Sequence, residues 1–188
     1  MALIALALLS GCGAERTSAS IVSAATVTLD ELPSGLGRGY PIALPIESND
    51  TGIGIGDRAP NFRLTLDDGR TLTLHDLAGR PILINFWATW CGPCRIEMPE
   101  ILRAARETPE LVVLAVNVEE ELEPIQAFAA DFEMDVVIPR DQDGDVRTLY
   151  QVRGMPMSYF IDRNGVIRAV WAGVLTPSRL EELLNQIL

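Results

Sequence analysis

The stretch NFWATWCGPCR, residues 85–95, holds the most informative residues of the chain. A nearly continuous apolar run, 82–87, leads into it and is typical of a strand that is covered on both faces. A helix is expected to begin near Gly92, with apolar residues at helical spacing further on. Cys91 would then lie just before the first helical turn, where unpaired N–H groups and the helix dipole stabilise a thiolate. Cys94 follows one turn later, close enough to attack a mixed disulfide on Cys91.

Thiol-disulfide chemistry is one of three interpretations of this cysteine pair. Thiols in C-x-x-C pairs at helix N-termini have pKa values lowered to about 3.5–7.5, which favours the reactive thiolate. A purely structural disulfide is less favoured, because so small a loop contributes little through chain entropy. A zinc site needs three or four protein ligands, and the chain has no second cysteine pair and a single histidine, His75. We therefore predict redox chemistry without a metal or a cofactor.

The charged residues exclude several other classes of function. There are 26 acidic and 15 basic residues, and the net charge is −11. This balance argues against a nucleic-acid partner, because neutralising phosphates requires a basic surface. All basic residues are arginine, so a Schiff-base lysine, a lysine-anchored pyridoxal cofactor and a Walker-type phosphate site are excluded.

Strand and helix patterns continue on both sides of the cysteine motif. Alternating apolar residues over 62–66 and 72–74, around the turn Asp67-Asp68-Gly69, predict a β-hairpin. The order ββ, then β-α-β-α-β-α, then ββα favours an α/β domain with a mixed sheet. After the cysteine helix, the predicted elements are a strand over 111–118, a helix from 124, a strand over 136–138, a helix over 145–151, strands over 157–161 and 166–171, and a helix after Thr176.

The motif FWATWCGPCR resembles the active site of the thioredoxin superfamily. The longer segment GDRAPNFRLTLDDGRTLTLHDLAGRPILINFWATWCGPCRIEMP is similar to the extracytoplasmic TlpA/ResA-type thiol:disulfide oxidoreductases, which have a redoxin or AhpC/TSA-like domain. The similarity covers roughly residues 56–188. It implies a thioredoxin-like three-layer sandwich, with a mixed central sheet, helices on both faces and an N-terminal β-hairpin extension. It also implies reduction of disulfides in exported proteins such as apocytochrome c, with electrons from a membrane protein of the DsbD/CcdA type.

The resemblance assigns roles to individual residues. Cys91 would be the attacking thiol and Cys94 the resolving thiol. Pro156, in the sequence GMP, matches the superfamily's cis-proline, which faces the cysteine pair. The backbone of Met155 would pair with the substrate polypeptide. For Trp90 two interpretations stay open, an aromatic of the core or site wall and a contact with substrate.

Asn85 distinguishes this chain from cytoplasmic thioredoxins, which carry a buried aspartate at the matching position. Because asparagine cannot accept a proton, another group must serve Cys94. The resemblance to ResA-type proteins implies an acidic residue after the VNV strand. Glu120 matches it best, and Glu119 and Glu121 are the alternatives in register. The competing interpretation is a solvated acidic helix start, stabilised by the helix dipole.

Four other functions compete with a disulfide reductase. A peroxiredoxin-type thiol peroxidase needs P-x-x-x-T/S-x-x-C, and this pattern fails at both Cys91 and Cys94. Copper metallochaperones of this fold use C-x-x-x-C with a downstream histidine, whereas no histidine follows His75. The others are a purely structural lipoprotein and an oxidant that uses the same cysteine pair.

The N-terminal region predicts export and lipid attachment. Residues 2–9, ALIALALL, resemble the h-region of a secretory signal and are too short to span a bilayer. The following LSGC, residues 9–12, resembles a bacterial lipobox, in which the signal is cut before the cysteine and the thiol receives a lipid. We expect a monomer that is lipid-anchored outside the cytoplasmic membrane through Cys12. The predicted organisation is a signal segment over 1–11, a flexible tether over 12–55 and a globular domain over 56–188.

Overall fold

The apolar run before the cysteine motif forms the central strand β4 (Ile82–Trp87), and all of its residues are buried. Strand β5 (Val112–Val118) pairs with it in parallel on one side, and β7 (Met157–Ile161) pairs antiparallel on the other. Successive side chains of β4 point to opposite faces. Trp87 therefore enters one hydrophobic cluster, whereas Ile84 enters the cluster on the other face. Burial on both faces explains the nearly continuous apolar run, in which Asn85 is the one polar residue.

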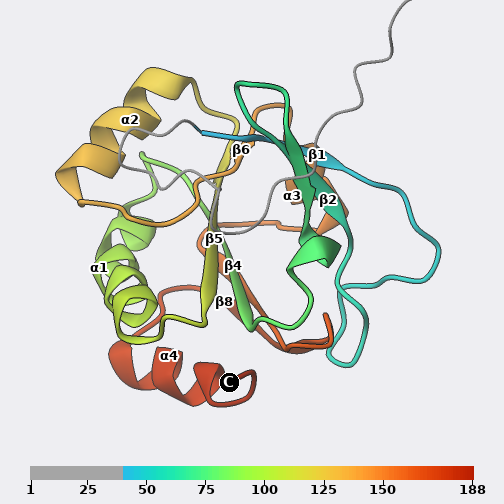
Figure 1. Cartoon of the computed structure of the whole chain (residues 1–188). Coiled ribbons are helices and arrows are strands. Elements are labelled where there is room, and N and C mark those ends of the chain that lie inside the picture. The colour runs from blue at the N-terminus through green and yellow to red at the C-terminus, as the bar shows by residue number, and fades with distance from the viewer. Residues whose placement is uncertain (1–39) are drawn as a thin grey trace, which may run out of the picture.

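The computed structural model describes residues 40–188, and the strands of this part form one mixed sheet (Figure 1). The order across the sheet is β3-β2-β1-β6-β5-β4-β7-β8. The antiparallel pair β2–β3 confirms the predicted hairpin, and β7 and β8 form a second antiparallel pair. The remaining strands are β1 (Ile42–Pro45), β2 (Phe62–Thr65), β3 (Thr71–Thr73), β6 (Arg140–Asp141) and β8 (Ile167–Ala172).

Helices cover both faces of the sheet, which confirms the predicted three-layer α/β architecture. On the Trp87 side lie α1 (Gly92–Glu107), α2 (Leu122–Asp131) and α4 (Pro177–Leu184). The 3-10 helix η2 (Leu74–Leu77) and the short α3 (Asp145–Leu149) pack on the other face. Figure 1 shows α1 and α2 on one side of the sheet and α3 on the other.

The predicted boundary between tether and domain, at residue 56, is wrong, because the folded domain begins earlier in the chain. Strand β1 lies inside the sheet, antiparallel to β2 and bridged in parallel to β6 through Ile42 and Arg140. Tyr40 is buried, and Ile53 packs against the core. The β2–β3 hairpin thus joins the sheet through a strand that the sequence did not indicate. With four residues, β1 is too short to show a periodic pattern, so the folded domain includes residues from Tyr40 onward.

The strand predicted over 136–138 is also displaced. The structure places β6 at Arg140–Asp141, after Pro139, and leaves a single bridge between Leu114 and Val137. Proline has no N–H to donate to a strand ladder, which accounts for the interruption. The predicted signal segment and Cys12 lie outside the described residues.

Candidate active site

Cys91 and Cys94 lie at the N-terminus of α1, as predicted, and a disulfide joins them. Cys91 is the N-cap residue, and its Sγ accepts a hydrogen bond from the N–H of Cys94 at 3.2 Å. Cys91 is 5% exposed and Cys94 is completely buried. The neighbouring Trp90 is 72% exposed. Cys91 is therefore the sulfur that an incoming substrate can reach first.

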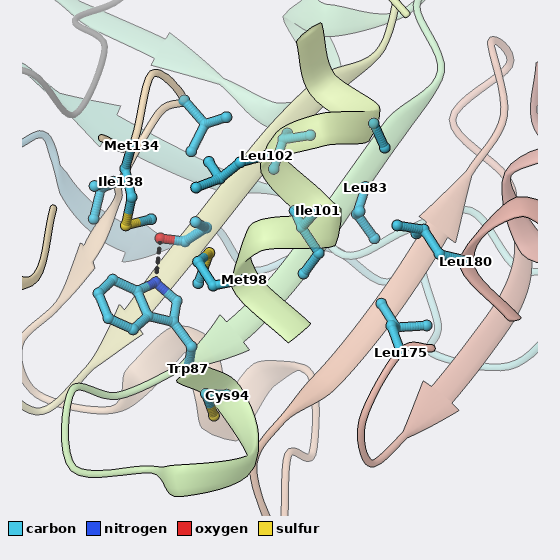
Figure 2. Packing of buried hydrophobic residues seen from close by; sticks show 14 of the residues in the cluster. Leu83, Trp87, Cys94, Met98, Ile101, Leu102, Met134, Ile138, Leu175 and Leu180 are labelled. Atoms are coloured by element: carbon cyan, nitrogen blue, oxygen red, sulfur yellow. Dashed lines mark hydrogen bonds between the residues drawn. The ribbon is translucent and has the colours of Figure 1, made fainter. Parts of the chain in front are cut away.

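Cys94 belongs to the hydrophobic cluster that packs between α1 and the sheet (Figure 2). Trp87 anchors this cluster, because its indole Nε1 donates to the carbonyl of Ala115 at 3.0 Å. The Trp87 ring also lies 4.6 Å from the ring of Phe128 on α2. Figure 2 shows Cys94 in one cluster with Trp87 and Met98. This packing fixes the first turn of α1, and with it the position of Cys94.

A buried carboxyl group, Glu97, lies on α1 one turn after Cys94, and the sequence analysis missed it. Its Oε1 accepts a hydrogen bond from Asn85 Nδ2 at 2.7 Å, and its Oε2 accepts one from the N–H of Leu175 at 2.7 Å. Burial raises the pKa of Glu97 to about 7, although both donors oppose the rise. A carboxyl group with this pKa can exchange a proton at neutral pH.

The spacing of residues along α1 indicates that Glu97 faces the core. Cys94, Glu97, Met98 and Ile101 occupy positions i, i+3, i+4 and i+7, so they share one face of α1, and all are buried. A glutamate on a core-facing stripe has a perturbed pKa more often than a surface glutamate, and such groups gather at functional sites.

Asn85, which the sequence analysis described as unable to accept a proton, acts as a donor in the structure. Its side chain is fully buried on β4. Its Nδ2 donates to Ser158 Oγ at 3.0 Å as well as to Glu97. Asn85 therefore ties the buried carboxyl group to the two central strands β4 and β7.

Glu120 lies against the loop that leads into Cys91. Its carboxylate accepts hydrogen bonds from the N–H of Thr89 at 2.7 Å, from the hydroxyl of Thr89, and from Nδ2 of Asn117 at 2.6 Å. Thr89 is two residues before Cys91. The carboxylate thus connects the end of β5 to the active-site loop.

The two neighbours of Glu120 point elsewhere. Glu119 forms an ion pair with Arg147 at 3.1 Å. Glu121 is exposed at the N-cap of α2 and makes no side-chain capping hydrogen bond. Of the three acidic residues considered for this position, Glu120 is the one that contacts the active-site loop.

The Met155–Pro156 peptide bond is cis, as predicted. Met155 is half-buried and packs against both hydrophobic clusters, one of which contains the two cysteines. Neither its N–H nor its C=O has a hydrogen-bond partner among residues 40–188. The backbone at Met155 is therefore free to pair with another chain.

Comparison with known proteins identifies the family of this chain. The sequence model of the AhpC/TSA family matches residues 55–170. The chain is also 37% identical to the thiol-disulfide oxidoreductase ResA of Oceanobacillus iheyensis, over 71% of this chain and 72% of that protein. The chain belongs to the AhpC/TSA family.

Two further matches specify the kind of AhpC/TSA protein. The thiol:disulfide interchange protein DsbE of Pseudomonas fluorescens biotype C is 36% identical, over 64% of this chain and 68% of that protein. The solved structure of a DsbE-type interchange protein from Chlorobium tepidum matches with a TM-score of 0.65 and 31% identity, over 71% of this chain and 97% of that one. This AhpC/TSA protein is therefore a thiol-disulfide oxidoreductase with a thioredoxin-like fold, which confirms the predicted family, fold and enzyme class.

Proposed function

We propose that this oxidoreductase reduces disulfides of exported proteins, with Cys91 and Cys94 as its redox pair. The observation that carries the proposal is the Cys91–Cys94 disulfide at the N-terminus of α1. Once this bond is reduced, the helix N-terminus favours a thiolate on Cys91. The oxidoreductase and interchange names of the relatives support the same exchange.

The proposed exchange has two steps that conserve electrons. The Cys91 thiolate attacks one sulfur of the substrate disulfide, so a mixed disulfide forms and one substrate thiolate leaves. Cys94 then loses its proton and attacks Cys91 Sγ, the second substrate thiolate leaves, and the Cys91–Cys94 disulfide forms. Two electrons pass from the dithiol to the substrate. A dithiol donor must then reduce the protein, and a membrane protein of the DsbD/CcdA type suits this role.

Glu97 is the group best suited to accept the proton from Cys94. It is buried on the same helix, one turn further on, and its pKa of about 7 leaves carboxylate available at neutral pH. Glu120 accepts hydrogen bonds from Thr89 and Asn117, so we propose that it positions the loop before Cys91. In this proposal Glu97 takes the proton-accepting role that the sequence analysis assigned to Glu120.

Trp90, Met155 and Pro156 form the proposed contact surface for substrate. The exposed indole of Trp90 and the unpaired backbone of Met155 support this assignment. The extended chain of a substrate would pair with Met155 while its disulfide meets Cys91.

We propose that the reaction takes place outside the cytoplasmic membrane, on a protein anchored through Cys12. The signal-like and lipobox-like sequences over 2–12 support this location. Among residues 40–188, no helix has the length and apolar character needed to cross a membrane. Apocytochrome c is the substrate that the resemblance to ResA-type proteins implies. Membrane fractionation of Cys12→Ala should find the protein in the soluble exported fraction, and undiminished membrane retention would contradict the anchor.

An insulin-reduction assay tests the reductase activity itself. With dithiothreitol as the electron donor, the parent protein should accelerate reduction of the insulin disulfides. Cys94→Ser should lose turnover, because its mixed disulfide cannot be resolved within the protein. Equal activity of the two proteins would contradict the proposed dithiol mechanism.

A further inference from the structure

A pocket of about 520 Å³ lies beside the Met155–Pro156 bond. Met157 and Tyr159 of β7 form part of its wall, and both belong to the hydrophobic cluster on the α3 side of the sheet. Ile53, from the segment after β1, lines the same pocket. The pocket thus adjoins the proposed substrate contact, and its β7 wall lies on the face of the sheet opposite to α1 and Glu97.

We propose that this pocket binds an apolar side chain next to the cysteine of an extended substrate polypeptide, and that Arg153 favours an acidic residue beside it. The inference rests on the proposed reduction of protein disulfides and adds a substrate preference to it.

The backbone beside the pocket indicates an extended polypeptide rather than a small disulfide. In residues 153–155, neither the N–H nor the C=O groups have a hydrogen-bond partner within the described part of the chain. Directly after them, Pro156 leads into β7, where pairing with β8 begins at Met157. An extended segment that pairs with such an open edge gains main-chain hydrogen bonds and places alternate side chains into adjacent pockets.

The pocket wall determines the kind of side chain that fits. Met155, Met157, Ile53 and Ala172 contribute mainly apolar surface. The phenol of Tyr159 is already engaged, because its hydroxyl donates to the carbonyl of Tyr150. Methionine side chains adapt to apolar groups of different shapes. An apolar substrate side chain is therefore matched better than a polar one.

Arg153 supplies the charge preference. Its side chain is exposed, lines the pocket and forms no ion pair or hydrogen bond within residues 40–188. It lies in a chain whose net charge is −11. An isolated cation at a binding surface attracts an acidic neighbour and opposes a basic one.

Peptide competition tests the apolar preference. Two disulfide-bonded peptides that differ by leucine or serine next to one cysteine are compared, with hydroxyethyl disulfide as a small reference. The parent protein should reduce the leucine peptide about 10-fold more efficiently in kcat/KM, a usual ratio for an apolar pocket. Ala172→Trp, which fills the pocket, should reduce this ratio to near one. Ala130→Trp, at an exposed position of α2, is the matched control and should keep the ratio.

Ile53→Asp is the second variant, and it should also remove the leucine preference. A parent protein that reduces both peptides equally, or a preference that survives both pocket variants, would overturn the proposal. Failure of the parent protein to reduce hydroxyethyl disulfide would instead contradict the proposed oxidoreductase chemistry, so the two failures are distinguishable.

Charge reversal tests Arg153 separately. Peptides with aspartate or arginine beside the leucine are compared, and the parent protein should prefer aspartate. Arg153→Glu should reverse this order, whereas Arg106→Glu, at an exposed position on α1, should not. Equal changes in both variants would show an effect of net charge alone and would overturn the role of Arg153.

Discussion

Two glutamates near the Cys91–Cys94 disulfide have different surroundings. Glu97 lies in the core on the same helix as Cys94, whereas Glu120 lies beside the loop that leads into Cys91. Glu97 is fully buried and accepts hydrogen bonds from Asn85 and Leu175, and burial raises its pKa to about 7. Glu120 is half-buried, and its carboxylate accepts hydrogen bonds from the loop before Cys91. Burial thus suits Glu97 to the proposed proton transfer, and the hydrogen bonds from Thr89 suit Glu120 to the proposed positioning of the loop.

The largest expected effects on disulfide reduction come from replacing Cys91, the accessible cysteine, and Cys94, the buried one. Cys91→Ser should abolish reduction and form no adduct, because the accessible thiolate is lost. Cys94→Ser should accumulate a mixed disulfide on Cys91, because the resolving thiol is missing. Intact-mass spectrometry after incubation with a peptide disulfide measures both. Adducts of equal yield on the two variants would contradict the assigned roles.

The pH dependence of the free energy of unfolding tests the raised pKa of Glu97. The pKa of Glu97 rises from its usual 4.5 to about 7 on folding. Between these pH values the unfolded chain loses this proton and the folded chain keeps it, so the free energy of unfolding falls as pH rises. Relative to Glu97→Gln, the parent should lose about 3 kcal/mol between about pH 4 and pH 8. Urea unfolding of both oxidised proteins measures this difference.

Glu100→Gln is the matched control for this measurement, because Glu100 lies on the same helix in an ion pair with Arg103. Its pH dependence should follow that of the parent protein. If Glu97→Gln also follows the parent, the raised pKa of Glu97 is wrong.

Removal of the buried carboxylate should also slow the chemistry. Glu97→Gln should reduce the rate at which Cys94 resolves the mixed disulfide by about 100-fold at neutral pH, a usual contribution of a general base. Stopped-flow measurement of thiol release gives this rate. A rate within twofold of the parent would show that Glu97 does not accept the proton.

The smallest effect is expected at Glu120. Glu120→Gln keeps one acceptor oxygen for Thr89 but loses the charge, so stability should fall by about 1 kcal/mol and the rate by about 3-fold. Glu121→Gln, at the exposed neighbouring position, should change neither quantity. Equal effects of the two variants in urea unfolding and turnover would remove the positioning role of Glu120.

The cysteine site could be predicted from sequence because its parts are local. Cys91 and Cys94 are three residues apart, and the apolar run before them indicates a doubly covered strand. The cis bond before Pro156 followed from a family resemblance, since the proline is far from the cysteines in the chain.

The missed features depend on contacts between distant segments. The helical spacing of Glu97 indicates its burial, but its hydrogen bonds with Asn85 and with the N–H of Leu175, 78 residues later, are contacts that spacing does not show. Strand β1 has four residues and obtains its place from β2 and β6 rather than from its own pattern. Short strands and buried polar contacts are therefore the parts of this fold that periodicity did not reveal.

The pH dependence of mixed-disulfide resolution tests the contrast between the two glutamates most directly. The rate is measured by stopped flow from about pH 5 to pH 9, a range that brackets the carboxyl and thiol titrations. In the parent protein and in Glu120→Gln, the rate should rise with an inflection at a pH of about 7, the pKa of Glu97. In Glu97→Gln this inflection should be absent. An inflection that persists in Glu97→Gln and disappears in Glu120→Gln would contradict the account and make Glu120 the proton acceptor.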